Sequence, residues 1–235
     1  MVEIKDLHKS FSKNNVLNGV DLNINKGGIF AVLGPNGSGK TTIIKSILGM
    51  VIPNKGSIKV FDSDIKKSSD YRHKIDYMPQ IANFPSNLKV IELIKMIKDL
   101  RGATDKDQML IETFKLEPFL NKKLGTLSGG TKQKVNIVLT FMFDSPIIIL
   151  DEPTTGLDPI SLIRLKELIA TEKQKGKAIL ITSHIMSFVE EVADEIVFIL
   201  EGKIYFRGSI KALQEKTKEK DFEHAIANIL IENHA

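Results

Sequence analysis

The feature that most constrains the fold is a glycine-rich loop between a continuous apolar run and a segment of helical periodicity. The run covers residues 29–33, IFAVL, and the loop follows it directly as GPNGSGKT, from Gly34 to Thr41. A short apolar run of this kind is typical of a strand buried on both faces of a parallel sheet. After the loop, apolar residues recur at helical spacing until Gly49, where the helix would end. The order of strand, glycine loop and helix therefore predicts an α/β core.

The loop has the residues that bind a phosphate group. Glycines at positions 34, 37 and 39 permit backbone angles at which successive N–H groups point inward at an anion. The ammonium group of Lys40 would neutralise phosphate charge, and the hydroxyl of Thr41 would be a magnesium ligand. A glycine-rich turn without a ligand is the alternative, and the strand and helix on either side of the loop argue against it.

A second buried strand delivers two acidic residues. Residues 147–150 are continuously apolar, and Asp151 and Glu152 follow them. Open α/β sheets bind ligands at the carboxyl ends of their strands. We therefore expect Asp151 to hold magnesium and Glu152 to orient and polarise the water that attacks a γ-phosphate. Acidic turn residues ahead of Pro153 are the alternative, which the phosphate loop upstream disfavours.

The remaining periodicity completes the α/β arrangement. Strands are expected at residues 2–7, 16–24, 178–182 and 195–200, and helices at 161–175 and 187–193. The two early strands, joined by a turn at 13–15, would form an antiparallel edge sheet. Residues 88–123 have the pattern of consecutive helices. The alternation of strands and helices elsewhere predicts a mostly parallel, doubly wound sheet.

Composition limits the setting of the protein. The absence of cysteine excludes a disulfide framework and a cysteine-ligated metal, and a net charge of +4 with scattered Lys and Arg predicts no nucleic-acid partner. The longest apolar runs, such as 196–200, are far shorter than the ~20 residues that span a bilayer. The N-terminal MVEIKDLHKSF has no apolar segment typical of a secretory signal. We expect one globular unit inside the cell, linked to a membrane only through a partner.

Three further motifs, in their order along the chain, resemble those of the ATP-binding cassette (ABC) family. LSGG, from Leu127 to Gly130, lies between the phosphate loop and the acidic strand. GLDP begins at Gly156, and His184 stands in ITSHI. The similarity extends over nearly the whole chain and implies ATP and Mg²⁺ as ligands.

The resemblance also implies a domain organisation. The fold would be a P-loop NTPase core with a mostly parallel sheet, an antiparallel β edge subdomain and an inserted helical subdomain. The ABC ATPase domain would cover residues 1–220, with the helical subdomain at about 84–145. A C-terminal helical tail would follow at 221–235.

The family motifs imply roles for individual residues. The implied catalytic residues are Glu152, the switch histidine His184 and Gln80 of YMPQ. Phe11 matches the aromatic residue that stacks on adenine. The implied nucleotide-binding residues are Phe11, Val16, Gly34, Pro35, Asn36, Gly37, Ser38, Gly39, Lys40, Thr41, Thr42, Ser128, Gly129, Gly130 and Asp158. The implied magnesium ligands are Thr41, Gln80 and Asp151.

The LSGG motif predicts a second anion site. Ser128 would cap a helix, and Gly129 and Gly130 would expose backbone N–H groups. In the family, the signature of one subunit covers ATP held by the other, so the resemblance implies a head-to-tail homodimer. Thr131 stands where the family usually has glutamine, and we expect activity to survive this change.

The resemblance also implies partners and a location. The chain would drive a separate membrane permease from the cytoplasmic face of the inner membrane, with residues 81–92 in the family position that contacts the permease. It looks most similar to ATPases of single-cassette exporters, and among them to those that assist copper-site maturation of nitrous oxide reductase, with a periplasmic accessory protein as a further candidate partner.

Two alternatives to a transporter subunit stay open. One is a soluble ABC ATPase such as an iron–sulfur cluster assembly ATPase, and the other is a nucleotide-dependent dimer without transport. Chromosome-type and translation-type relatives are disfavoured, because only residues 42–126 separate the phosphate loop from LSGG and only one phosphate loop occurs in the sequence.

Overall fold

The computed structural model describes residues 1–25, 27–102 and 106–234, with side chains up to residue 231. Three parts of the chain lie outside the described residues. They are residue 26, in the expected ABC ATPase domain, residues 103–105, in the expected helical subdomain, and residue 235, in the expected C-terminal tail. The elements of the described residues are, in chain order, β1 Val2–Phe11, β2 Asn14–Ile24, β3 Gly28–Leu33, α1 Lys40–Ile47, β4 Lys55–Val60, β5 Ser63–Asp64, η1 Asp70–Lys74, β6 Ile75–Met78, α2 Val90–Arg101, α3 Lys106–Thr113, η2 Glu117–Phe119, η3 Leu124–Thr126, α4 Gly129–Phe141, β7 Ile147–Asp151, α5 Pro159–Gln174, β8 Ala178–Thr182, α6 Met186–Val192, β9 Glu195–Leu200, β10 Lys203–Gly208, α7 Ile210–Thr217 and α8 Phe222–His234.

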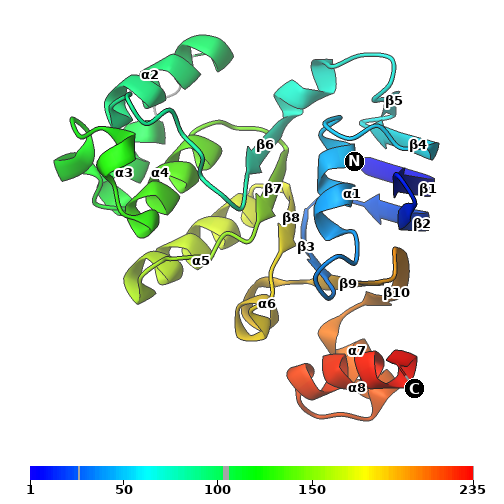
Figure 1. The fold of residues 1–235 in the computed structure, drawn as a ribbon. Coiled ribbons are helices and arrows are strands. Elements are labelled where there is room, and N and C mark those ends of the chain that lie inside the picture. Colours follow the sequence, from blue (N-terminus) through cyan, green and yellow to red (C-terminus); the bar gives the residue numbers. More distant parts are fainter. Residues whose placement is uncertain (26, 103–105, 235) are drawn as a thin grey trace.

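The central sheet has the strand order β10-β9-β3-β8-β7-β6, six strands within the described part of the chain (Figure 1). Strands β9, β3, β8, β7 and β6 are parallel to their neighbours, and β10 pairs antiparallel with β9 at one edge. Strands β3, β7 and β8 are buried along their whole length, because helices cover both faces of the sheet. The predicted α/β fold with a mostly parallel sheet is confirmed.

A second, antiparallel sheet has the order β2-β1-β4-β5 in the described residues. The predicted pairing of the two early strands is confirmed, with Val2 opposite Ile24. The predicted turn at 13–15 is wrong, because the chain reverses at Ser12 and Lys13 and β2 already begins at Asn14. Ser12 has a φ of 53°, and this left-handed angle allows the reversal within two residues.

The described residues form two hydrophobic cores, which lie on opposite faces of the central sheet. Successive side chains of a strand point to opposite faces, so β3 contributes to both cores. Phe30 and Val32 pack with α1 and the antiparallel sheet, and α1 lies between the two sheets in Figure 1. Ile29, Ala31 and Leu33 belong to the other core, which includes residues of α4, α5 and α6. The start of α1 is thereby held against the end of β3.

Helices α2, α3 and α4 form a lobe beside the β6 edge of the sheet (Figure 1). Arg101, at the end of α2, donates a hydrogen bond of 2.5 Å to the carboxylate of Asp76 in β6. The Asp76 side chain is fully buried and also accepts a bond of 2.9 Å from the Ser145 hydroxyl. Burial raises the pKa of Asp76, and the Arg101 guanidinium opposes that rise. This ion pair fastens the lobe to the central sheet.

The C-terminal helices pack on the same molecule. Phe222 and Ala225 of α8 are buried in the core that also contains Phe198 of β9, and α8 contacts α6 and α7. Figure 1 shows α7 and α8 below strands β9 and β10. Among the described residues, no helix combines the length and the apolar character needed to cross a lipid bilayer.

Candidate functional site

A pocket of about 350 Å³ lies where strands β3, β6, β7 and β8 of the central sheet end. It is lined by Phe11, Val16, Gly34, Asn36, Gly37, Gly39, Lys40, Thr41, Thr42, Gln80, Asp151, Glu152 and His184. All of these residues were expected from the sequence to form one site. They come together because the carboxyl ends of parallel strands lie at the same edge of a sheet.

The glycine loop follows β3 and wraps around the side chain of Lys40. The Lys40 ammonium group donates hydrogen bonds of 2.7 Å to the carbonyl of Gly34 and 2.9 Å to that of Pro35. A side chain at Gly34 would place its Cβ 2.1 Å from the Ile199 carbonyl oxygen, so glycine is required there. Partial burial lowers the pKa of Lys40, while the carboxylates of Glu152 and Asp151 raise it. The loop holds a cation at the floor of the pocket.

Two carboxylates at the end of β7 face this cation. Asp151 and Glu152 are 3% and 7% exposed, and the Thr182 hydroxyl of the neighbouring strand β8 donates a hydrogen bond to Asp151. The backbone N–H of Glu152 donates to the Thr182 carbonyl at 3.1 Å. Glu152 has a φ of 50°, a left-handed conformation that is uncommon for a residue with a side chain. Backbone strain of this kind often accompanies functional sites.

His184 follows β8 and contacts the second carboxylate. Its Nδ1 lies 2.8 Å from Oε2 of Glu152, and its backbone N–H donates to the same oxygen at 3.4 Å. The His184 side chain is 73% exposed, so the rest of the ring faces the open side of the site. Carboxylate and imidazole are thus held together at the rim.

The opposite rim of the pocket comes from the antiparallel sheet and from the segment after β6. Phe11 is the last residue of β1 and is 47% exposed. Lys9 pairs with Leu17 and Ser10 with Asn15, so Val16 is the extra residue of β2 between these two pairs. This β-bulge turns β2 locally. Gln80, which follows β6, is exposed. These side chains leave the phosphate loop open to solvent.

Several expected residues do not line this pocket. Pro35 and Ser38 belong to the loop but are not among the lining residues, and the buried Ser38 hydroxyl has no hydrogen-bond partner among the residues that the structure describes. The others lie elsewhere on the chain, at the start of α4 and α5: Ser128, Gly129, Gly130 and Asp158. The chain therefore has two separate groups of expected ligand-binding residues.

Ser128 caps α4 as the sequence predicts. Its hydroxyl accepts a hydrogen bond from the backbone N–H of Thr131 at 3.3 Å and lies 2.9 Å from the Thr131 hydroxyl. Ser128 and Gly129 are exposed. Exposed N–H groups at a helix start can bind an anion.

Asp158 caps α5 in the same way. Its carboxylate accepts hydrogen bonds of 2.9 Å from the backbone N–H and the hydroxyl of Ser161, and it pairs with the Lys134 ammonium group at 2.7 Å. The hydrogen bond from Lys134 holds the pKa of Asp158 well below its usual range. The starts of α4 and α5 are joined through this ion pair.

Comparison with known proteins identifies the family. A family model described as ABC transporter matches residues 17–155, more than half of the chain. The chain belongs to this family. The ABC protein is therefore an ATP-binding cassette with ATPase chemistry, and the pocket described above is the part of it that carries the phosphate loop.

Two curated relatives of this ABC protein have names that refer to transport. The lantibiotic transport ATP-binding protein SrtF of Streptococcus pyogenes is 38% identical over 205 residues, which cover 87% of this chain and 89% of the relative. The Nod factor export ATP-binding protein I of Burkholderia lata is 31% identical over 220 residues, which cover 91% of this chain and 72% of the relative.

Solved structures have the same fold. An ATP-binding subunit of an ABC transporter matches with a TM-score of 0.91 at 28% identity, over 98% of this chain and 99% of the other. A dimeric ATP-binding cassette in a post-hydrolysis state, with ADP and Pi bound, matches with a TM-score of 0.80 at 24% identity, over 89% and 98%.

Thr182 is a site residue that the sequence did not single out. It holds Asp151 through its hydroxyl and Glu152 through its carbonyl. The sequence gives a weak indication of this role, because Thr182 is a hydroxyl residue at the end of the apolar run 178–181, two positions before His184. A polar residue that ends a buried strand beside an acidic strand is a candidate partner for the carboxylates.

Proposed function

We propose that the chain is the ATP-hydrolysing subunit of an ABC transporter, and that two copies close head-to-tail on two MgATP to drive a separate membrane permease. The observation that carries this proposal is the pocket in which Lys40, Glu152 and His184 lie together at the carboxyl edge of one sheet. Phosphoryl transfer to water needs a cation on the phosphates and a group that orients the water.

Each residue of the pocket has a task in this proposal. Lys40 exchanges its two carbonyl partners for phosphate oxygens, with which its hydrogen bonds are stronger because both partners are charged. Glu152 orients and polarises the attacking water. His184, bonded to Glu152, offers its exposed edge to the γ-phosphate and keeps the carboxylate in place. The Phe11 ring supports the base.

The pocket also fits Mg²⁺. Thr41, Gln80 and Asp151 bring hydroxyl, amide and carboxylate oxygens to it, and these are the ligands that Mg²⁺ prefers. The Thr182 hydroxyl fixes the orientation of the buried Asp151 carboxylate. When bound, Mg²⁺ neutralises phosphate charge.

Two substitutions test the catalytic assignment. Lys40→Ala removes the cation and is expected to abolish ATP binding or hydrolysis, whereas Lys45→Ala, at an exposed position on the same helix, is expected to retain both. Glu152→Gln is expected to bind ATP but hydrolyse it slowly. Phosphate release and equilibrium ATP binding measure the two effects. Lys40→Ala hydrolysis at the wild-type rate would contradict the assignment.

The second half of each site is assigned to another copy of the chain. Ser128 and Gly129 are exposed and stand apart from the pocket, so their helix start is free to meet an anion on a partner. The dimeric cassette with ADP and Pi bound, which has the same fold, supports this arrangement. Lys134 and Asp158 brace the two helix starts that face the partner.

A double variant tests the shared site. Glu152→Gln is expected to accumulate as a dimer with MgATP, as seen by light scattering. Outside its own helix backbone, a Cβ at Gly129 meets no atom of the described residues within 4 Å, so Gly129→Ala is expected to leave the monomer and its pocket intact. Added to Glu152→Gln, it should prevent dimerisation while ATP still binds. Monomeric Glu152→Gln, or an undisturbed dimer in the double variant, would refute the shared site.

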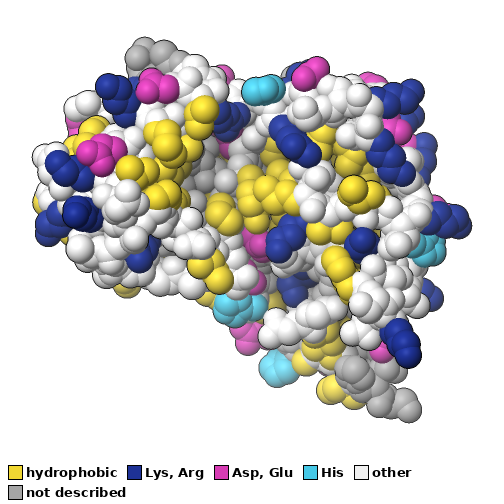
Figure 2. All heavy atoms as spheres, turned by 45° about the horizontal axis from the view of Figure 1, so that its top comes forward, with side chains coloured by type: hydrophobic (Ala, Val, Ile, Leu, Met, Phe, Trp, Pro, Cys, Tyr) yellow, Lys and Arg dark blue, Asp and Glu magenta, His cyan; other side chains and the backbone are white. Residues whose placement is uncertain are grey.

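The assignment to a transporter rests on the relatives and on an apolar hollow. The two relatives named above are transport or export proteins by name. Figure 2 shows hydrophobic side chains gathered in the hollow between the helical lobe and the core. Ile81, at 76% exposure, and Ile91, at 39%, belong to the segment 81–92 expected to meet a permease. We infer a location at the cytoplasmic face of the membrane through that permease.

Within this proposal the transporter is an exporter. The name of the Nod factor relative refers to export and supports this direction. Neither name refers to copper, so the nitrous oxide reductase assignment and its periplasmic accessory protein stay predictions from the sequence. Purification from detergent-solubilised membranes tests the class. Recovery with an integral membrane protein is expected, and recovery only with soluble partners would instead support the iron–sulfur assembly alternative.

A further inference from the structure

The Phe11 ring carries a cation on one face. The ammonium group of Lys9 lies 4.8 Å from the ring centroid, within the range of a cation–π contact. Phe11 lines the nucleotide pocket and Lys9 does not. Lys9 therefore contacts the ring without being part of the pocket lining, to which Phe11 belongs.

Lys9 is itself held in place by the loop after α1. Its ammonium group donates a hydrogen bond of 2.9 Å to the Ile52 carbonyl. In the same loop, the Asn54 side chain accepts a bond of 2.7 Å from the Ser10 N–H, and the Asn54 N–H donates to the His8 carbonyl at 2.8 Å. We call these contacts the hairpin brace. They fasten the last residues of β1 to the segment that follows α1.

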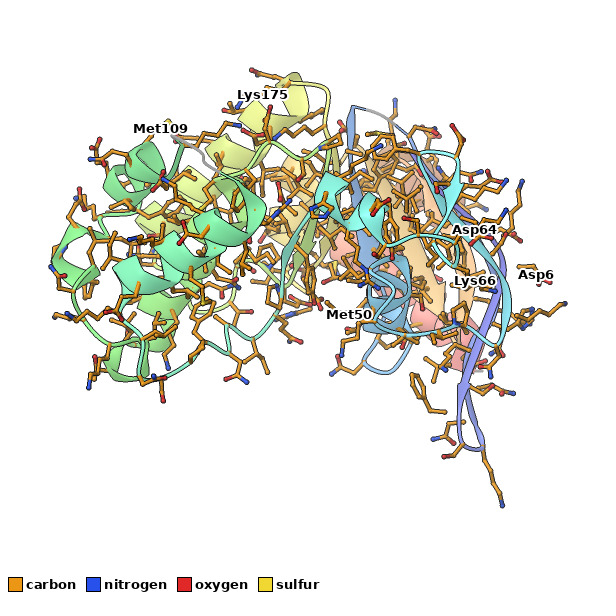
Figure 3. The ribbon with its side chains drawn as sticks, turned by 90° about the horizontal axis from the view of Figure 1, so that it is seen from above. Asp6, Met50, Asp64, Lys66, Met109 and Lys175 are labelled. Atoms are coloured by element: carbon orange, nitrogen blue, oxygen red, sulfur yellow. The ribbon has the colours of Figure 1, made fainter. Side chains whose placement is uncertain are left out.

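The hairpin brace matters because Phe11 stands at the end of a strand. It precedes the turn at Ser12 and Lys13, and strand ends next to exposed turns open more readily than strand centres. The helix α1 begins at Lys40 in the phosphate loop and leads into Met50, which lies beside α1 and between the two halves of the molecule in Figure 3. The brace thus connects the phosphate loop to the aromatic ring through one helix and one short loop.

We propose that Lys9 is a positioning residue for the nucleotide base. It links the Phe11 ring to the loop after α1 through its own hydrogen bond to Ile52, so that the ring is ordered before the base stacks on it. Ordering a group before binding removes part of the entropy loss that binding would otherwise carry. The inference rests on the proposed function, in which Phe11 contacts the base of ATP.

A double-mutant cycle on ADP binding tests this inference. ADP avoids hydrolysis and carries the base. Lys9→Met is expected to raise the Kd for MgADP about 3–10-fold, the loss of one exposed cation–π contact and one hydrogen bond. In a Phe11→Ala background, Lys9→Met is expected to have no further effect. Calorimetry measures all four chains, and thermal unfolding checks that each is folded.

Three controls separate positioning from a general effect. Lys9→Arg keeps a cation over the ring and is expected to restore binding to near the wild-type level. Lys5→Met removes one charge from an exposed position on the same strand and should leave the Kd unchanged. Pyrophosphate, which has no base, should compete with a fluorescent nucleotide equally well in the wild type and in Lys9→Met.

Each contrary result has a defined meaning. A Kd for Lys9→Met within twofold of the wild type, an equal loss in the Phe11→Ala background, or an equal loss for pyrophosphate would overturn the role of Lys9. Unchanged ADP binding by Phe11→Ala would also remove Phe11 from the proposed function. Weak binding by Phe11→Ala with normal binding by Lys9→Met would overturn the positioning role alone.

Discussion

Two neighbouring glycines at the start of α4 give a matched test of how the LSGG helix is joined to the acidic strand. In the part of the chain that the structure describes, a Cβ at Gly129 meets nothing within 4 Å beyond its own helix backbone, whereas a Cβ at Gly130 would lie 2.6 Å from the Gly156 carbonyl oxygen. Close-packed interiors do not tolerate so short a contact, so the segment around Gly156 must move by at least about 0.4 Å. Overpacking of this size costs about 1–3 kcal/mol.

Both substitutions replace glycine by alanine in the first turn of one helix, so the gain in helix propensity cancels in their difference. We expect Gly130→Ala to be less stable than Gly129→Ala by about 1–3 kcal/mol, or roughly 2–12 °C in Tm for a chain of this length. Thermal and urea unfolding measure the difference. Equal stability of the two variants would show that Gly130 and Gly156 are not in close contact.

Three further predictions concern the stability of the fold. Lys177→Met removes a cation that is 6% exposed from a pair with Glu172 and should lower stability by about 3–5 kcal/mol, whereas Lys175→Met, at an exposed position, should change it by less than about 1 kcal/mol in urea unfolding. Burial raises the pKa of Glu172, but hydrogen bonds from Lys175 and Lys177 outweigh it and hold the pKa below 4.5. This contribution is present above pH 4.5 and lost as the pH falls, so Glu172→Gln should destabilise at neutral pH and lose its effect in acid. Gly34→Ala should prevent soluble expression or ATP binding, because its Cβ would clash with Ile199, and a normal yield of active protein would refute this.

The sequence predicts best the strands that consist of a continuous run of apolar residues, because such a run indicates burial on both faces. Residues 147–150 and 178–182 are buried on both faces and form β7 and β8 as expected. Strand β6 was not predicted, because IDYM carries Asp76 in the middle of its apolar residues. That carboxylate is buried only because Arg101, 25 residues later in the chain, pairs with it. A partner so distant cannot be read from local periodicity.

Other elements were missed for related reasons. Strands β4 and β10 are half exposed and contain lysine, glycine and arginine, so no alternation marks them. Figure 3 shows Asp6, Asp64 and Lys66 on the outer side of the antiparallel sheet. Of these, Asp64 belongs to β5, a strand of two polar residues that no apolar pattern marks. The turn between β1 and β2 depends on the left-handed φ angle of Ser12. A serine in the sequence does not predict such an angle.

The candidate site was easier to predict than the strands around it. The phosphate loop has a spacing that the backbone chemistry of phosphate binding restricts, and the resemblance to the ABC family pointed to the other pocket-lining residues, such as Phe11, Gln80 and His184. Thr182 and Lys9 were not predicted, because neither belongs to such a motif. Each acts through another residue, Thr182 through Asp151 and Lys9 through Phe11. Such supporting contacts depend on how separate strands meet and are visible only in the fold.

The two groups of expected ligand-binding residues are mechanically connected within one chain. The buried Gln133 side chain of α4 donates a hydrogen bond of 3.1 Å to the Pro153 carbonyl, the residue after Glu152. Lys134 pairs with Asp158 at the other end of the same segment. The segment from Pro153 to Asp158 is thus attached at both ends to the LSGG helix, and any movement of Glu152 in the proposed cycle would be passed to that helix. If two copies share their sites as proposed, that helix contacts the other ATP, and hydrolysis in one site loosens the grip on the second.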